Sequence, residues 1–322
     1  MHIDAARYLG LVRAPERLKP TLAIHVAEHA FLPSVDEILG DWVATIAVPA
    51  FKLIREREGE QQAFCSIGAG VGLDVLAAIE TLAASEIGLT DVHVDVVEAA
   101  RQNVRDNLLE PGRIRLRAGC GDLLEPLAPT DGTPPPQYDL IYENLPNVPV
   151  DNAETIAIAR ASSGHLPPRK EEIPALMRRN LLALHYVALC KAKDFLKPGG
   201  SVLSLIGGRI PLAVFQEMGR LAGYRSEILT YGWKIQTDPE EMIGGHARQE
   251  AAGFGPYHFY RAEPLSTIFS SLDPAKSGAA ALAIEQQLQP HAISPAEALQ
   301  RWRTGEIIGH TVVALRSWRT GD

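Results

Sequence analysis

Three alternating glycines, Gly68, Gly70 and Gly72, constrain this chain most, because they follow a short apolar run and open a helical pattern. The apolar run Ala63–Ile67 is typical of a buried strand, and Gly72–Ile87 has the spacing of a helix. Glycines at such a junction let the backbone turn sharply and leave the N–H groups of the helix start open to a ligand. The pattern indicates either a nucleotide-type site or a plain tight turn.

Apolar strand patterns alternate with helical patterns along most of the chain, which predicts βαβ units and a parallel sheet. The other predicted strands are Val92–Val97, Ile114–Arg117, Tyr138–Glu143, Ser201–Ile206, Ser226–Tyr231 and His310–Arg316. The other predicted helices of this part are Glu98–Leu109, Glu171–Leu196 and Ile210–Ala222. The expected fold class is therefore α/β: a Rossmann-like, seven-stranded, doubly wound sheet whose last strand is antiparallel.

Four regions are expected along the chain. Residues 1–60 form a helical N-terminal region, with helical spacing in Leu22–Phe31 and Ile38–Ile54 and a capping box that opens at Ser34. Residues 61–233 form the Rossmann-like core, and residues 307–322 supply its last strand. Residues 234–306 interrupt the core as an inserted helical cap, with helices near Lys276–Gln289 and Pro295–Arg303.

Two acidic residues strengthen the interpretation of the glycine turn as a ligand site. Asp95 is placed near the end of the second predicted strand, about 20 residues past Gly72, where a carboxylate can accept hydrogen bonds from ribose hydroxyls. Asp122 follows the third strand, where its side chain can reach an adenine amino group. Together these residues favour a nucleoside ligand. A nicotinamide dinucleotide is the competing ligand, but the turn is GxGxG and not GxGxxG.

The end of the fourth predicted strand carries Asn144-Leu145-Pro146-Asn147, followed by Val148-Pro149. In this segment the chain resembles the class I S-adenosylmethionine-dependent methyltransferases. It is most similar to the subgroup that methylates amide or exocyclic nitrogens, including the glutamine methyltransferases of release factors, which carry Asn-Pro-Pro-Tyr and then Ile-Pro here. The resemblance covers roughly residues 60–232 and the last strand.

The resemblance implies S-adenosylmethionine as cofactor and assigns roles to individual residues. The implied cofactor contacts are Gly68, Gly70 and Gly72, with Ser66 before them, for the methionine part, Asp95 for the ribose, Asp122 and Leu123 for the adenine, and Asn144 facing the sulfonium. The interval from Asp95 to Asn107 also fits the family's second helix.

Three departures from the family pattern bear on the substrate. Ser66 stands where the family usually has an acid that helps hold the amino group of the ligand, and Leu145 replaces the first proline. Asn147 replaces the aromatic residue that would stack on a planar acceptor, and an amide offers hydrogen bonds instead of a stacking face. A small amine or amino acid is therefore the expected methyl acceptor, with Asn144, Asn147 and Tyr142 as the candidate catalytic residues.

Two other functions stay open. If the ligand is bound folded back, its own α-amine can attack the carbon next to sulfur, giving azetidine-2-carboxylate and methylthioadenosine, as in a few methyltransferase-like cyclases. The altered segment Asn144–Asn147 and the acid lost at Ser66 are changes that such a posture would require. A non-catalytic module that binds S-adenosylmethionine is the third alternative.

The composition argues against nucleic acids and membranes as partners. The formal net charge of −8 argues against general binding to a nucleic-acid backbone. No apolar run reaches the ~20 residues of a membrane span, and the start of the chain has no apolar signal core, so we expect a cytoplasmic protein. His246 and His258 lack zinc-ligand spacing with any cysteine, and we expect no metal. His165, Tyr186 and Ser204 are further candidates for ligand contact.

Overall fold

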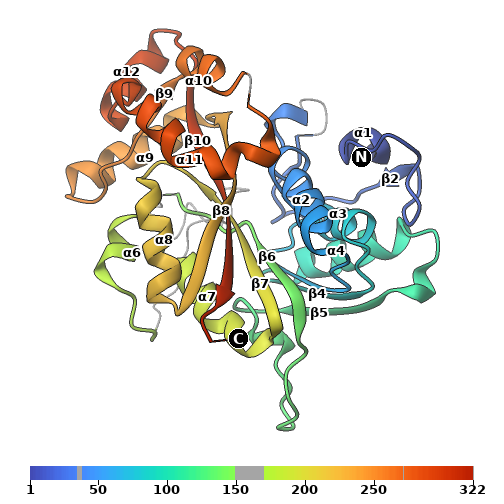
Figure 1. Cartoon of the computed structure of the whole chain (residues 1–322). Helices are drawn as coiled ribbons and strands as arrows, with labels where there is room; N and C mark the ends of the chain where they lie inside the picture. The colour runs from blue at the N-terminus through green and yellow to red at the C-terminus, as the bar shows by residue number, and fades with distance from the viewer. Residues whose placement is uncertain (35–37, 149–169, 271, 322) are drawn as a thin grey trace.

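The computed structural model describes residues 1–34, 38–148, 170–270 and 272–321, and its centre is a mixed sheet (Figure 1). The strands are β3 Ala63–Ile67, β4 Glu86–Asp91, β5 Arg115–Cys120, β6 Tyr138–Glu143, β7 Leu196–Gly207, β8 Tyr224–Ile235, β9 Tyr260–Arg261 and β10 Ile308–Arg319. Within the described residues, seven of them follow the order β5-β4-β3-β6-β7-β10-β8, and the short β9 pairs with β10. The five strands from β5 to β7 are parallel, and β10 is antiparallel to both neighbours. The predicted α/β fold class is confirmed.

The order of the strands reverses at β3, which lies between β4 and β6. In open α/β sheets such a reversal opens a crevice at the carboxyl ends of the strands. Side chains of β3 alternate between two cores: Phe64 packs with helices on one face and Cys65 with helices on the other. The covering helices are α2 Val48–Glu58, α3 Leu73–Thr81 and α4 Val94–Asp106 on the first face, and α7 Ala183–Ala192 and α8 Leu212–Leu221 on the second.

The second strand and its helix begin earlier than predicted. The pattern of Val92–Val97 suggested a strand, but β4 ends at Asp91 and α4 begins at Val94. Val92 and Val94 are exposed, whereas Val96, Ala100 and Val104 form the buried face of α4 at helical spacing. The predicted position of Asp95 at a strand end is therefore wrong, because this residue lies in the first turn of α4.

The N-terminal region is less helical than predicted. It contains β1 His2–Asp4, the short α1 Ala5–Tyr8, β2 Thr21–Ala23, a π-helical turn over Val43–Ala47 and α2. The predicted helix Leu22–Phe31 is wrong, since its start belongs to β2, which pairs with β1. Two side-chain amides hold this segment: Asn103 of α4 exchanges hydrogen bonds with the backbone of His25, and Asn107, directly after α4, does so with the backbone of Ala23. The capping box proposed for Ser34 extends over residues 35–37, which lie outside the described residues.

The predicted long helix Glu171–Leu196 is broken into α6 Ala175–Arg179 and α7. Leu181, between the two, has a φ of 58°, which a helix interior does not allow. The stop signal at Lys197–Gly200 belongs to β7, whose pairing with β6 shifts register there.

The insertion packs directly on the sheet. Its helices are α9 Pro239–Ala251, α10 Ala262–Phe269, α11 Pro274–Leu288 and α12 Pro295–Arg303, so both predicted helices are confirmed within two residues. Figure 1 shows this group at one end of the sheet. Helix α11 lies so close to β8 that a Cβ at Gly278 would clash with the backbone carbonyl oxygens of Ile228 and Leu229. No helix in the described ranges is long and apolar enough to cross a membrane.

Candidate functional site

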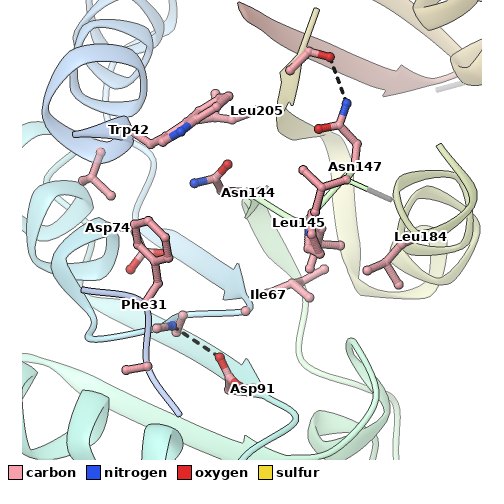
Figure 2. A pocket seen from close by; sticks show the side chains of 18 of the residues that line it. Phe31, Trp42, Ile67, Asp74, Asp91, Asn144, Leu145, Asn147, Leu184 and Leu205 are labelled. Atoms are coloured by element: carbon pink, nitrogen blue, oxygen red, sulfur yellow. Dashed lines mark hydrogen bonds between the residues drawn. The ribbon is translucent and has the colours of Figure 1, made fainter. Parts of the chain in front are cut away.

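A cavity of about 820 Å³ lies at the carboxyl ends of β3, β4 and β6. The N-terminal segment closes one side with Phe31 and Trp42, and the end of β8 closes another with Lys234 and Gln236. Figure 2 shows Asn144 in the middle of the space, between Trp42 and Leu145. The volume falls within the range of small-molecule sites, ~300–1,000 Å³.

The glycine turn lines this cavity at two of its three predicted positions. Gly68 and Gly70 have φ values of 70° and 50°, and both border the cavity. A Cβ at Gly70 would meet no protein atom within 4 Å, so the backbone is open to a ligand there. Gly72 lies behind the cavity wall, where its φ of 81° and missing side chain let α3 approach the carbonyl oxygen of Ala100.

The acid at the end of the second strand is Asp91 and not the predicted Asp95. The carboxylate of Asp91 lines the cavity and accepts the N–H groups of Gly70 at 3.4 Å and His93 at 3.2 Å. Its burial raises the pKa of Asp91 above the usual value. Asp95 does not line the cavity in the described structure; it contacts the Nδ1 atom of His29 at 3.0 Å.

Asp122 and Leu123, predicted beside the adenine, both line the cavity. Asp122 pairs with the Nζ atom of Lys191 at 3.0 Å. Leu123 is buried and has a φ of 50°, so the backbone turns here directly after β5. These two residues follow Gly121, just past the end of β5, and together with Asp91 they form part of the cavity wall.

Ser66 is fully buried and reaches the cavity only through another residue, Asp74. Its hydroxyl donates to the carboxylate of Asp74, which comes from the first turn of α3 and lines the cavity. Burial raises the pKa of Asp74 to about 7. A buried carboxylate therefore lies beside position 66 after all, in Asp74, a residue that the sequence did not point to.

The three predicted catalytic residues all line the cavity at the end of β6. Asn147 is fixed by a hydrogen bond of 2.8 Å from its Nδ2 atom to the carbonyl of Gly207 (Figure 2). The hydroxyl of Tyr142 is buried and has no hydrogen-bond partner among the described residues. Asn144 projects into the open space beside Leu145 (Figure 2).

A buried pair behind Asn144 holds this segment in place. The carboxylate of Glu143 accepts the N–H of Leu145 at 3.0 Å and contacts the Nδ1 atom of His185, on α7, at 2.9 Å. Both side chains of the pair are fully buried. Because Glu143 bonds the backbone on the far side of Asn144, the pair restrains the backbone from which Asn144 projects.

Two of the remaining candidates, Ser204 and Tyr186, do not line the cavity in the described structure. Ser204 is buried within β7, and Tyr186 is half-buried on α7. His165 lies outside the described residues. His246 is packed between the rings of Tyr257 and Phe259.

A second set of cavity residues comes from the other side of the sheet and was missed by the sequence analysis. Arg209 follows β7, Lys234 and Gln236 come from the end of β8, and His310 from the start of β10. Arg209 and Gln236 lie just past the ends of β7 and β8, and β8 carries other polar residues such as Arg225 and Glu227, so nothing local indicates which of these residues face a ligand.

No protein-family model matches the chain. No curated protein matches it. Similar solved structures include precorrin-6y C5,15-methyltransferase from Geobacter metallireducens GS-15, with 11% identity over 92% of this chain and 94% of the other, at a TM-score of 0.38. The cyclase SpnF has 15% identity over 93% of this chain and 88% of its own, at 0.41. The ribosomal protein L11 methylase from Lactobacillus delbrueckii subsp. bulgaricus has 15% identity over 57% and 71%, at 0.35. Values this low carry no statement about substrate or site residues.

Proposed function

We propose that this protein is an enzyme that binds S-adenosylmethionine in the cavity and transfers its methyl group to a nitrogen of a small amine or amino acid. The observation that carries the proposal is the convergence of the open backbone at Gly70, the strand-end acid Asp91 and the amide of Asn144 on one cavity. Asp91 takes the role that the sequence had suggested for Asp95, that of accepting hydrogen bonds from ribose hydroxyls.

The residues of the cavity fit such a ligand from end to end. Asp122, Leu123, Asp91 and Asp74 all line the cavity. In the proposal, Asp122 and Leu123 contact the adenine, Asp91 the ribose and Asp74 the ammonium of the methionine part. The unpartnered hydroxyl of Tyr142 offers one more hydrogen bond in a buried place, and a buried polar group of this kind is costly unless a ligand satisfies it.

Bound S-adenosylmethionine supplies a methyl group attached to a positively charged sulfur. A neutral amine attacks the methyl carbon in line with the C–S bond, and the sulfur leaves. The protein's part is to hold the nucleophile at ~3 Å and in line, because positioning accounts for most of the acceleration in such reactions. The side-chain oxygen of Asn144 accepts an N–H of the acceptor, and the bond between Glu143 and the Leu145 N–H restrains the backbone that carries this side chain.

The cyclase remains the second candidate because of one observation, the buried carboxyl of Asp74 beside the glycine turn. With a pKa of about 7, Asp74 can accept the proton of the ligand's ammonium. The freed amine then displaces sulfur from the γ-carbon, the electrons of the C–S bond pass to sulfur, and azetidine-2-carboxylate and methylthioadenosine result.

Three measurements test the proposal. Calorimetry is expected to detect binding of S-adenosylmethionine to the wild-type protein and to detect no binding of a nicotinamide dinucleotide. The reverse result overturns the proposal. Incubation with S-adenosylmethionine alone is expected to give no methylthioadenosine, whereas its formation identifies the cyclase.

Asn144→Ala is expected to keep ligand affinity and to lower turnover by ~100-fold, as the loss of one positioned hydrogen-bonding group typically does. A protein whose function is binding alone would show no turnover for the substitution to change.

A further inference from the structure

Arg209 is a buried cation for which the described residues provide no carboxylate partner. Its side chain is 4% exposed, and its Nη2 and Nε atoms donate to one neutral acceptor, the Oε1 atom of Gln236, at 2.7 and 3.3 Å. The guanidinium carbon lies 5.7 Å from the ring centre of Phe259. Burial lowers the pKa of Arg209 to about 9. Burying an unpaired guanidinium is costly, so a group that the described protein does not supply is needed to balance it.

The other strongly buried arginine in the described structure shows how the fold treats such a charge. Arg316, in β10, is 1% exposed, and its two Nη atoms lie 2.5 and 2.6 Å from the carboxylate of Glu58. Both arginines are therefore buried, but Arg316 pairs with the carboxylate of Glu58, whereas Arg209 lines the cavity.

The unpaired charge lies next to the segment proposed to direct methyl transfer. A Cβ at Gly207 would clash with the Nη1 atom of Arg209 and lie 3.1 Å from the Oδ1 atom of Asn147. Gly207 thus leaves the guanidinium room beside Asn147. An anion bound by Arg209 would place the rest of its molecule against Asn147 and Asn144.

Besides Arg209, this end of the cavity carries the buried cation Lys234 and the buried acid Asp41. Lys234 is 5% exposed and donates to the carbonyl of Gly40. Asp41 already accepts the hydroxyl of Tyr8 and the N–H groups of Val43 and Ala44.

Two further titratable groups line this end of the cavity. Burial, followed by the charge of Arg209, holds the pKa of His310 well below its usual value, so that ring is neutral. Asp238 is exposed at the start of α9. The acids proposed for S-adenosylmethionine, Asp74, Asp91 and Asp122, come from the opposite half of the sheet, β3 to β5.

We propose that Arg209 binds the carboxylate of the second substrate, so that the methyl acceptor is an amino acid or a similar amino-carboxylic acid. A planar guanidinium can donate two parallel hydrogen bonds to a carboxylate. Gln236 orients the guanidinium of Arg209 by accepting hydrogen bonds from its Nε and Nη2 atoms. This inference rests on the proposed function, since it places the acceptor amine at Asn144.

The test uses the full chain saturated with S-adenosylhomocysteine and a panel of the standard amino acids, each compared with the amine that lacks its carboxylate. At least one amino acid is expected to raise the melting temperature of the wild type by several degrees, and its amine is expected to do so far less. Arg209→Met is expected to weaken binding of that amino acid by ~30-fold or more, the usual effect of removing one partner of a buried charged pair. Arg209→Lys keeps a positive charge but cannot form two parallel hydrogen bonds. Its affinity for the amino acid is expected to lie between that of the wild type and that of Arg209→Met.

Gln236→Glu is the matched variant, because it keeps Arg209 and gives the guanidinium an internal carboxylate. It is expected to be more stable than the wild type without substrate and to lose the response to amino acids. If no amino acid stabilises the wild type, or if the response survives in Arg209→Met, the proposal is wrong.

A titration with S-adenosylmethionine separates the two sources of a carboxylate. Arg209→Met is expected to bind S-adenosylmethionine within about twofold of the wild type, since separate sites contribute independently. If its affinity instead falls as far as that of the amino acid, Arg209 binds the methionine carboxylate, and the proposal of a carboxylate on the second substrate is overturned. Failure of the wild type to bind S-adenosylmethionine would contradict the proposed function itself.

Discussion

Asp74 is a single residue on which stability and ligand binding place opposite demands. It is 4% exposed, and burial raises its pKa to about 7 from an unfolded value of ~3.9. The folded protein therefore holds a proton that the unfolded chain releases between about pH 4 and pH 7. Stability contributed by the protonated form is lost as pH rises through this window, by up to ~4 kcal/mol for a shift of ~3 pKa units.

Asp74→Asn is accordingly expected to raise the free energy of unfolding at pH 8 by ~2–4 kcal/mol and to leave it unchanged at pH 5, where the wild-type carboxyl is also neutral. Urea unfolding at the two pH values measures this difference. The same substitution is expected to weaken S-adenosylmethionine binding. The affinity of the wild type is expected to rise between pH 6 and pH 8, as Asp74 loses its proton, and the variant is expected to lack this rise. Equal stability of the two proteins at pH 8 would show that Asp74 is not held neutral by the fold.

Asp91 and Asp95 are the most direct residue-level test of the ligand geometry. Asp91→Asn is expected to lower the affinity for S-adenosylmethionine by ~10–100-fold, the effect of losing charged hydrogen bonds to hydroxyls. Asp95→Asn is the matched control, because Asp95 does not line the cavity itself in the described structure and contacts the lining residue His29, so its loss is expected to change affinity by less than about threefold. Isothermal titration of both variants decides between the two acids.

At this scale the sequence predicted the kind of residue better than its position. Asn103 follows Asp91 at the same interval at which Asn107 follows Asp95, and both acids stand about 20 residues past Gly72. The pattern alone could not separate the two pairs. Asp74 and Arg209 could not be identified as site residues, because their significance comes from burial without an ion-pair partner, which depends on distant parts of the chain.

At the scale of elements, β3 and β6 were predicted to the residue, because each is a short apolar run between clear turn signals. Strand β4 was missed because it contains Gly88, which weakens a strand pattern. Gly88 is needed because of a residue in β6: a Cβ at position 88 would clash with the hydroxyl of Tyr138, whose ring lies against β4. A contact between segments so far apart in sequence leaves no local signal.

Helix α11 offers the element-scale prediction. Gly278→Ala is expected to lower the free energy of unfolding by ~1–3 kcal/mol, because the added methyl group meets the rigid backbone of β8. Gly112→Ala is the matched control: its Cβ would meet no atom within 4 Å, and its φ is not positive. Urea unfolding of both variants measures the difference. A neutral Gly278→Ala would show that α11 can shift away from the sheet at no cost.

For the whole molecule, the cavity joins the N-terminal segment, the core and the insertion, since Trp42, Asn144 and Met242 of α9 all line it. The four sequence regions are therefore expected to unfold together. Calorimetry is expected to show one transition, and S-adenosylmethionine at about 100 times its dissociation constant should add ~2.7 kcal/mol to the unfolding free energy of that single transition. A separate transition for the insertion, unmoved by the ligand, would contradict this expectation.

Strand β10 enters the sheet between β7 and β8, although the whole insertion separates it from β8 along the chain. During synthesis, β7 and β8 therefore leave the ribosome with facing edges that no neighbour yet occupies. Unpaired strand edges can pair with the strands of other chains. The nascent polypeptide is therefore prone to aggregate until β10 has been synthesised and pairs with β7 and β8. Truncations before residue 308 should accumulate as aggregates, and co-translational holding factors should matter more for this chain than for one whose sheet grows from one edge to the other.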